Sequence, residues 1–192
     1  FFFFFFFFFF FGQFNTSDYG TAFTERNAFF AKGSADLKVA KLGVDYIRFT
    51  GDEHENLIGA NLMIPAGDFR VFGEYWKNTS VDHDYDRAWN AGIGYGKMDL
   101  KKPGSFALSL AYNDVDYGVH FGGTGLQTDV LSQLTNKATY GDAFNVTFWN
   151  AMADVTLQKN VYLHAEYAFD VDAEASDTDV KDAWNVSLNY KF

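Results

Sequence analysis

The chain lacks several features that mark familiar classes of protein. It contains no cysteine, which excludes a disulfide framework and a thiolate metal site. It has two prolines in 192 residues and no apolar run of about eighteen residues, so the sequence predicts no transmembrane helix. Its formal net charge of −10 argues against nucleic acid as a partner. The length is sufficient for one domain.

The clearest pattern is a strict alternation of apolar and polar residues at positions 182–192. The apolar set is Trp184, Val186, Leu188, Tyr190 and Phe192. This period of two is typical of a β-strand with unlike faces, and aromatics at both ends are typical of a strand that crosses a bilayer. From residue 184 to residue 192 the strand would measure roughly 26 Å, or about 20 Å of height once tilted, close to the ~25 Å apolar band of outer-membrane barrels.

The same alternation recurs along the chain, and short turns alternate with longer acidic loops. Short turns at one end and long loops at the other are the rule in transmembrane barrels. The sequence therefore predicts an all-β fold, a transmembrane antiparallel up-and-down β-barrel with about ten strands in this chain. The expected short turns include residues 33–36, 65–68, 101–104 and 158–160. The expected strands are residues 1–14, 21–32, 37–49, 57–64, 69–76, 88–100, 105–113, 144–157, 161–172 and 182–192.

Residues 1–11 are all phenylalanine. This run is too short for a membrane helix and lacks the basic residues that begin a signal peptide. We interpret it as a stand-in for a strand of unidentified sequence. Removing these 11 from the 24 Phe leaves 13, beside 4 Trp and 11 Tyr, so the aromatic signal does not depend on the run.

The polar positions of the strands are expected to face inward. Such residues can line a water-filled lumen that conducts solutes, or they can form a salt-bridged plug in a narrow barrel. Small residues at 92, 94 and 96 favour open space over a packed interior. The predicted pore-lining set is Asp45, Asn61, Arg70, Glu74, Asn90, Ser109, Asn150, Asp154, His164, Glu166, Asp170, Asn185, Asn189 and Lys191.

The stretch 114–143 is the longest irregular segment expected. Thr128 or Asp129 is suited to cap one short helix there. The segment either folds into the barrel as a constriction or remains a surface loop, and the pattern does not decide between the two. Near Phe148 the alternation slips, which indicates a β-bulge.

Other motifs do not support chemistry. Asp82, Asp84 and Asp86 have calcium-loop spacing, but the glycine and glutamate that an EF-hand requires are absent, so a solvated acidic loop is expected. His164 and Glu166 share a strand face, but no nucleophile accompanies them in the pattern. We expect no catalytic site, no metal and no cofactor.

Residues 102–112 (KPGSFALSLAY), 122–124 (GGT) and the ending 190–192 (YKF) resemble the porins of diderm Firmicutes that carry an S-layer homology domain. The similarity covers roughly residues 37–192. The resemblance implies a larger barrel of about sixteen strands, of which this chain would be a C-terminal part, assembled as homotrimeric diffusion pores. It also implies that Phe192 belongs to a signal read by the barrel assembly machinery. The family's S-layer homology domain and stalk have no counterpart here.

The sequence and this resemblance together predict a porin of the bacterial outer membrane, in a Gram-negative type of envelope. It would allow passive diffusion of small hydrophilic solutes and ions, with outer-membrane lipid as its surroundings. The alternatives are a non-conducting structural or adhesive barrel, a small barrel enzyme, and a soluble ligand-binding barrel. The last would place its apolar face inside.

Overall fold

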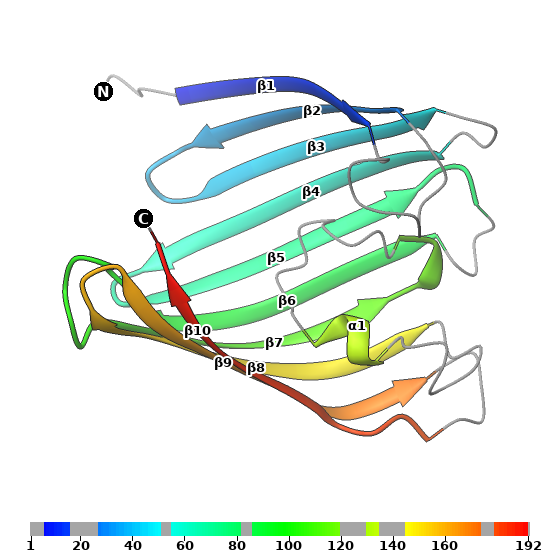
Figure 1. Cartoon of the computed structure of the whole chain (residues 1–192). Helices are drawn as coiled ribbons and strands as arrows, with labels where there is room; N and C mark the ends of the chain where they lie inside the picture. The colour runs from blue at the N-terminus through cyan, green and yellow to red at the C-terminus, as the bar shows by residue number, and fades with distance from the viewer. Residues whose placement is uncertain are drawn as a thin grey trace.

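The computed structural model describes residues 6–15, 27–50, 55–81, 86–119, 130–134, 145–173 and 179–191. They form one sheet of ten antiparallel strands, in which each strand pairs with its neighbours in the sequence (Figure 1). The predicted all-β, up-and-down architecture is confirmed. The strands are β1 (Phe6–Asn15), β2 (Asn27–Asp36), β3 (Lys41–Thr50), β4 (Glu55–Ala66), β5 (Phe69–Asn78), β6 (Arg87–Gly96), β7 (Phe106–Val115), β8 (Val146–Gln158), β9 (Val161–Ala173) and β10 (Ala183–Tyr190).

Helical structure in the described part of the chain is limited to two short elements. They are the 3-10 helix η3 (Tyr117–Val119) and the α-helix α1 (Leu131–Leu134). Among the described residues, no helix is long and apolar enough to span a bilayer.

Some predicted boundaries are wrong. Residues 33–36 were expected to turn but belong to β2, and the turn lies at 37–40. Strand β6 ends at Gly96 rather than at residue 100, because Gly96 adopts a left-handed conformation with φ of 75°.

Short connections gather at one end of the sheet, which we call the turn end, and longer ones at the opposite loop end (Figure 1). Each connection at the turn end contains a residue with positive φ: Lys38, Gly67, Gly104 and Asn160. Such residues allow the tight reversals that antiparallel neighbours require. These connections hold successive strands in fixed register.

One face of the sheet is apolar and uncovered, and we call it the outer face. Among the described residues, 21 large hydrophobic side chains are exposed, nearly all of them on this face. Directly opposed residues of antiparallel strands point to the same side. One line of opposed residues crosses seven strands and contains Ile64, Val71, Ile93, Leu110, Ala151, Tyr167 and Trp184.

Aromatic side chains form two rows on the outer face. The row near the turn end includes Phe69, Tyr95 and Phe106, with ring centroids 4.9 and 6.0 Å apart along it. The row near the loop end includes Trp89, Tyr112 and Trp149, with centroids 5.6 and 5.4 Å apart. On four strands one aromatic of each row lies six residues from the other, in the pairs Phe69/Tyr75, Trp89/Tyr95, Phe106/Tyr112 and Trp184/Tyr190. Aliphatic residues fill the space between.

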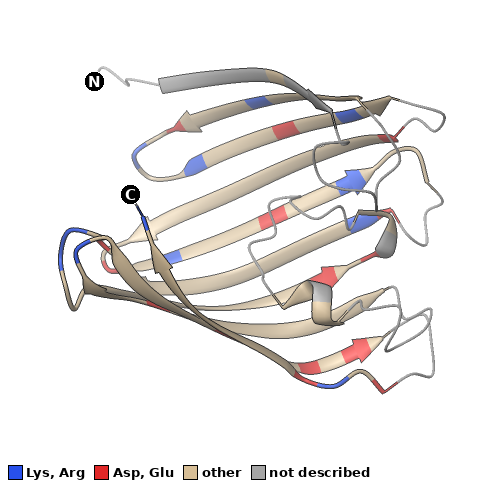
Figure 2. Ribbon diagram, viewed as in Figure 1, with Lys and Arg blue, Asp and Glu red and all other residues tan. Residues whose placement is uncertain are grey.

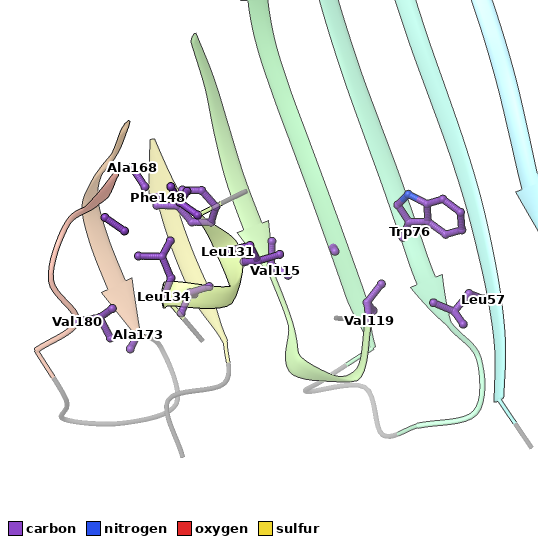
Figure 3. Close-up of a cluster of buried hydrophobic side chains, with 14 residues drawn as sticks. Leu57, Trp76, Val115, Val119, Leu131, Leu134, Phe148, Ala168, Ala173 and Val180 are labelled. Carbon is purple, nitrogen blue, oxygen red and sulfur yellow. The ribbon is translucent and has the colours of Figure 1, made fainter. Parts of the chain in front are cut away.

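The opposite, inner face is mostly polar but carries an apolar cluster near the loop end. Helix α1 packs there, with Leu131 and Leu134 beside Val115 and Phe148, and Val119 of η3 lies near Leu57 and Trp76 (Figure 3). Leu134, Val119 and Phe148 have no exposed surface.

Strands β8 and β9 do not pair evenly throughout. Their register shifts between Thr147 and Trp149, so the irregularity predicted near Phe148 is confirmed. The extra residue lies on β9, where Asp170 has φ of 55°. Continued alternation along the expected strand 161–172 would place Val171 on the outer face with Val161, but Val171 packs against the inner apolar cluster.

The sheet is not closed. In the described part of the chain, β1 pairs only with β2 and β10 only with β9. The predicted ten strands are therefore present, but the pairing that would make them a barrel is not.

Inner-face glycines are covered by the large side chains that oppose them. A Cβ on Gly59 would lie 2.8 Å from the Trp76 indole, and one on Gly94 would lie 2.4 Å from Cζ of Arg70. A Cβ on Gly92 would likewise lie 2.6 Å from Leu110 O and 2.7 Å from the Phe72 ring. The expectation that glycines here leave open space is wrong, because side chains of neighbouring strands lie across them.

This packing predicts unequal effects of two matched substitutions. Gly59→Ala would push against the buried indole of Trp76, so we expect it to lower the free energy of unfolding by about 1–3 kcal/mol. Gly94→Ala meets a flexible guanidinium and should cost less. Denaturant unfolding measures both, and equal losses would contradict the role given to Trp76.

Candidate functional site

The inner face gathers most of the predicted pore-lining residues. Twelve of the fourteen lie on it by strand register: Asp45, Asn61, Arg70, Glu74, Asn90, Ser109, Asn150, Asp154, His164, Glu166, Asn185 and Asn189. A polar line of Asn61, Glu74, Asn90 and Asn113 crosses β4 to β7.

The other two predicted residues lie elsewhere. Asp170 is exposed and sits at the β9 irregularity, where alternation no longer assigns a face. Lys191 follows the end of β10 and lies at the turn end, where its backbone N–H donates to Asn160 O at 2.9 Å. Strand register therefore assigns neither residue to the inner face.

One polar network spans β2 to β4. Lys32 Nζ lies 3.2 Å from Oδ1 of Asp45, and Asn61 Nδ2 donates to Oδ2 of the same carboxylate at 3.2 Å. On β5, Glu74 accepts a 2.5 Å hydrogen bond from the indole N–H of Trp76. Asp45 is therefore held by side chains of the two neighbouring strands, and Glu74 by a side chain of its own strand.

Arg70 is held nearer the turn end. Its Nη1 donates to Gly96 O at 3.0 Å, and its guanidinium lies over Gly94. Gly94, which has no side chain, leaves room for the guanidinium of Arg70, and the carbonyl of Gly96 accepts its hydrogen bond.

A second network joins β8 and β9. Asn150 Nδ2 donates to Oε1 of the buried Glu166 at 2.5 Å. His164 lies between two carboxylates, with Nδ1 2.9 Å from Oδ1 of Asp154 and Nε2 3.8 Å from Oε2 of Glu166. The four side chains form one connected chain of polar contacts.

Ser187 of β10 lies opposite His164 in register, so a hydroxyl, an imidazole and Asp154 follow one another across three strands. The contacts do not match a nucleophilic arrangement. Ser187 Oγ accepts a hydrogen bond from Asn189 Nδ2 at 2.8 Å, and Nε2 of His164 faces Glu166. A general base should instead contact the hydroxyl that it activates. The geometry favours a surface-lining role for this network.

The described part of the long loop lies on the inner face. Leu131 and Leu134 of α1 pack there, Gln133 Nε2 donates to Trp184 O of β10 at 3.4 Å, and Asn78 Nδ2 donates to Gly118 O at 2.7 Å. Between the two placements left open by the sequence, these contacts favour a loop folded over the polar face.

Several predictions fall outside the described residues. These are the assembly signal at Phe192, the helix-capping residues Thr128 and Asp129, and most of the acidic stretch at 82–86. Among the residues that are described, no group of three or more His, Asp or Glu is placed to hold a metal ion.

Sequence reasoning missed two contributors to the inner face. Lys32 pairs with Asp45, and Trp76 is buried against Gly59 and Glu74. Continuing the alternation of β5 from Arg70 and Glu74 to position 76 would have assigned Trp76 to this face. The partner of Asp45 required the β2–β3 register.

Comparison with known proteins adds no family to this description. No protein-family model matches the chain, and no curated protein matches it. The class defined by the fold is an all-β sheet with one polar and one apolar face.

The β8–β9 network predicts a stability effect that depends on connectivity. Asn150→Ala removes the bond to a buried carboxylate, so we expect the free energy of unfolding to fall by about 1–3 kcal/mol. Asn189→Ala is the control, because among the described residues its amide donates hydrogen bonds only to Ser187 of its own strand, so its loss should cost less. Denaturant titration compares them, and a larger loss in Asn189→Ala would refute this assignment.

Proposed function

We propose that this protein is a porin of the bacterial outer membrane that allows passive diffusion of small hydrophilic solutes and ions. The observation that carries the proposal is the separation of the two faces. Large apolar side chains are exposed on one, and a set of charged and amide side chains covers much of the other. A membrane barrel requires this arrangement, with lipid outside and water inside.

The extent of the outer face argues for lipid contact. Monomeric soluble proteins rarely expose continuous apolar patches larger than a few hundred Å². Here an apolar line crosses seven strands, and exposed residues include Ile93, Leu108 and Leu188. A soluble ligand-binding barrel would bury this face inside, so the arrangement does not favour that alternative.

The two aromatic rows also support a membrane location. Tyr and Trp favour bilayer interfaces because their rings are amphipathic. A separation of six residues corresponds to about 20 Å along a strand, or roughly 15 Å of height once tilted, which is less than the ~25 Å height of the apolar band in outer-membrane barrels. The rings would therefore lie inside the borders of that band, on either side of its middle.

A conducting pore requires closure by additional strands. An eight-stranded barrel has an interior filled by side chains, whereas sixteen to eighteen strands leave an aqueous channel. The ten strands form an open sheet. Following the porin resemblance noted from the sequence, we propose that the complete barrel has about sixteen strands and assembles as a homotrimer. In it, the loop segment carrying α1 would narrow the lumen from the inner face.

Single-channel recording in planar bilayers tests this function. We expect stepwise openings from the purified protein. Leu134→Asp should enlarge the conductance, because a buried carboxylate would detach α1 from the inner face. Gln133→Asp is the matched control on the same helix, because residue 133 is exposed and loses only its 3.4 Å hydrogen bond to Trp184 O, so it should change the conductance less than Leu134→Asp.

Two results would count against these statements. Equal conductance of both variants would contradict the role of α1 as a constriction. Membrane-inserted protein that shows no openings would overturn the porin proposal itself.

A non-conducting structural barrel is the second candidate. It is favoured by the apolar cluster on the inner face, where Val115, Val146 and Phe148 are buried under α1. If this packing fills the barrel interior, recordings will be silent in both Leu134→Asp and the unaltered protein.

Lipid contact is tested by placing the same charge on two exposed valines. Val71 lies centrally on the outer face and is 52% exposed, whereas Val39 lies in the β2–β3 turn and is 73% exposed. In reconstituted protein, Val71→Lys should lower the free energy of unfolding by about 2–4 kcal/mol, as expected near a bilayer midplane. Val39→Lys should have little effect. Equally small effects would show that water rather than lipid surrounds residue 71.

A further inference from the structure

The described lysines fall into two groups. Lys32, Lys41, Lys77 and Lys181 each lie within 4.0 Å of a carboxylate oxygen. The others have no such carboxylate among the described residues, and all of them lie at the turn end: Lys38, Lys97, Lys101, Lys102, Lys159 and Lys191. In a chain of net charge −10, the described lysines without a nearby carboxylate are therefore all at the turn end, where Figure 2 shows blue segments in the connections between strands.

Four of these lysines surround a hollow of about 780 Å³. It is lined by Lys97, Met98, Asp99, Leu100, Lys101, Lys102, Ser105, Asn160 and Lys191. Among the described residues the lining contains one carboxylate, Asp99, whose Oδ1 accepts a 2.9 Å hydrogen bond from the backbone N–H of Lys101. The hollow therefore carries a strong excess of positive charge.

Backbone hydrogen bonds hold the walls of the hollow together. Asn160 N–H donates to Leu100 O at 2.8 Å, and Lys191 N–H donates to Asn160 O at 2.9 Å. The β6–β7 connection, the β8–β9 turn and the end of β10 are thus joined into one surface. The lysines project from fixed backbone rather than from independent loops.

The hollow lies next to the aromatic row of the turn end. Lys97 follows Tyr95 by two residues, and Lys191 directly follows Tyr190. If these rings lie inside the border of the apolar band, the lysines lie close to that border, and their long side chains reach the level of the lipid phosphates.

We propose that this hollow, the turn-end lysine site, binds the phosphate groups of anionic phospholipids in the leaflet around the turn end. The inference rests on the proposed membrane location. Ammonium groups bind phosphate oxygens as compact point charges and need no fixed fork geometry. Clustered lysines that face a membrane surface favour anionic lipid by about fivefold for each side chain.

The probe is spin-labelled phosphatidylglycerol, compared with spin-labelled phosphatidylcholine, in phosphatidylcholine vesicles that contain the reconstituted protein. Electron paramagnetic resonance gives the ratio of their association constants at the protein surface. We expect phosphatidylglycerol to be preferred several-fold, and the preference to fall as salt is raised because the charges are exposed.

Two double variants separate the site from net charge. Lys101→Gln with Lys102→Gln removes two of the four lysines of the hollow and should lower the ratio severalfold. Arg48→Gln with Lys181→Gln removes the same charge from exposed positions at the loop end and should leave most of the preference intact. Trypsin resistance of the reconstituted strands confirms insertion in each sample.

The experiment distinguishes failure of the turn-end lysine site from failure of the proposed membrane location. Inserted protein with a ratio near one, or equal losses in both double variants, overturns the lysine site and leaves the membrane proposal standing. Protein that does not insert overturns both. Abolition of the preference by millimolar inorganic phosphate at constant ionic strength would assign the site to free phosphate and overturn the lipid as its ligand.

Discussion

Antiparallel register is the constraint on which both faces of this sheet depend. Side chains alternate along a strand, so a slip of one residue would exchange the faces of that strand. From β4 to β10 the register instead keeps Ile93 level with Val71 and Leu110 on one side, and Asn90 level with Glu74 on the other. The close reversals at the turn end fix this alignment, since each contains a residue that tolerates left-handed backbone.

The inner face is not uniform, and its variation identifies where the chain covers itself. Polar contacts such as Asp45 with Asn61 and Asn150 with Glu166 lie where strand side chains meet each other. The buried apolar residues of this face gather near the loop end, under α1 and η3. Phe148 is apolar although its position in the alternation faces the polar side, because α1, which lies outside the sheet, packs over it. The same phase carries Asn150 two residues later.

Period-two alternation predicted the strands and most of the inner face, because both follow from local sequence. It failed where the outcome depends on a second strand. The extra residue of β9 placed Val171 on the inner side, and only pairing with β8 reveals it. Gly94 was expected to leave space, but the space is occupied by Arg70 from the opposing strand. Closure of the sheet is likewise not encoded in any one strand.

The aromatic rows do not distinguish the turn end of the sheet from its loop end, but the charged side chains do. The rows are nearly equivalent, with an aromatic residue at each end of the outer face on β5, β6, β7 and β10, so they define a band without distinguishing its two borders. The charges do distinguish them. Unpaired lysines lie beyond the row that contains Tyr95, while Asp114 receives the indole N–H of Trp89 in the other row at 2.8 Å. Exposed ion pairs contribute little to folding stability, so the fold alone gives no reason for this asymmetry, whereas the proposed membrane location would supply one.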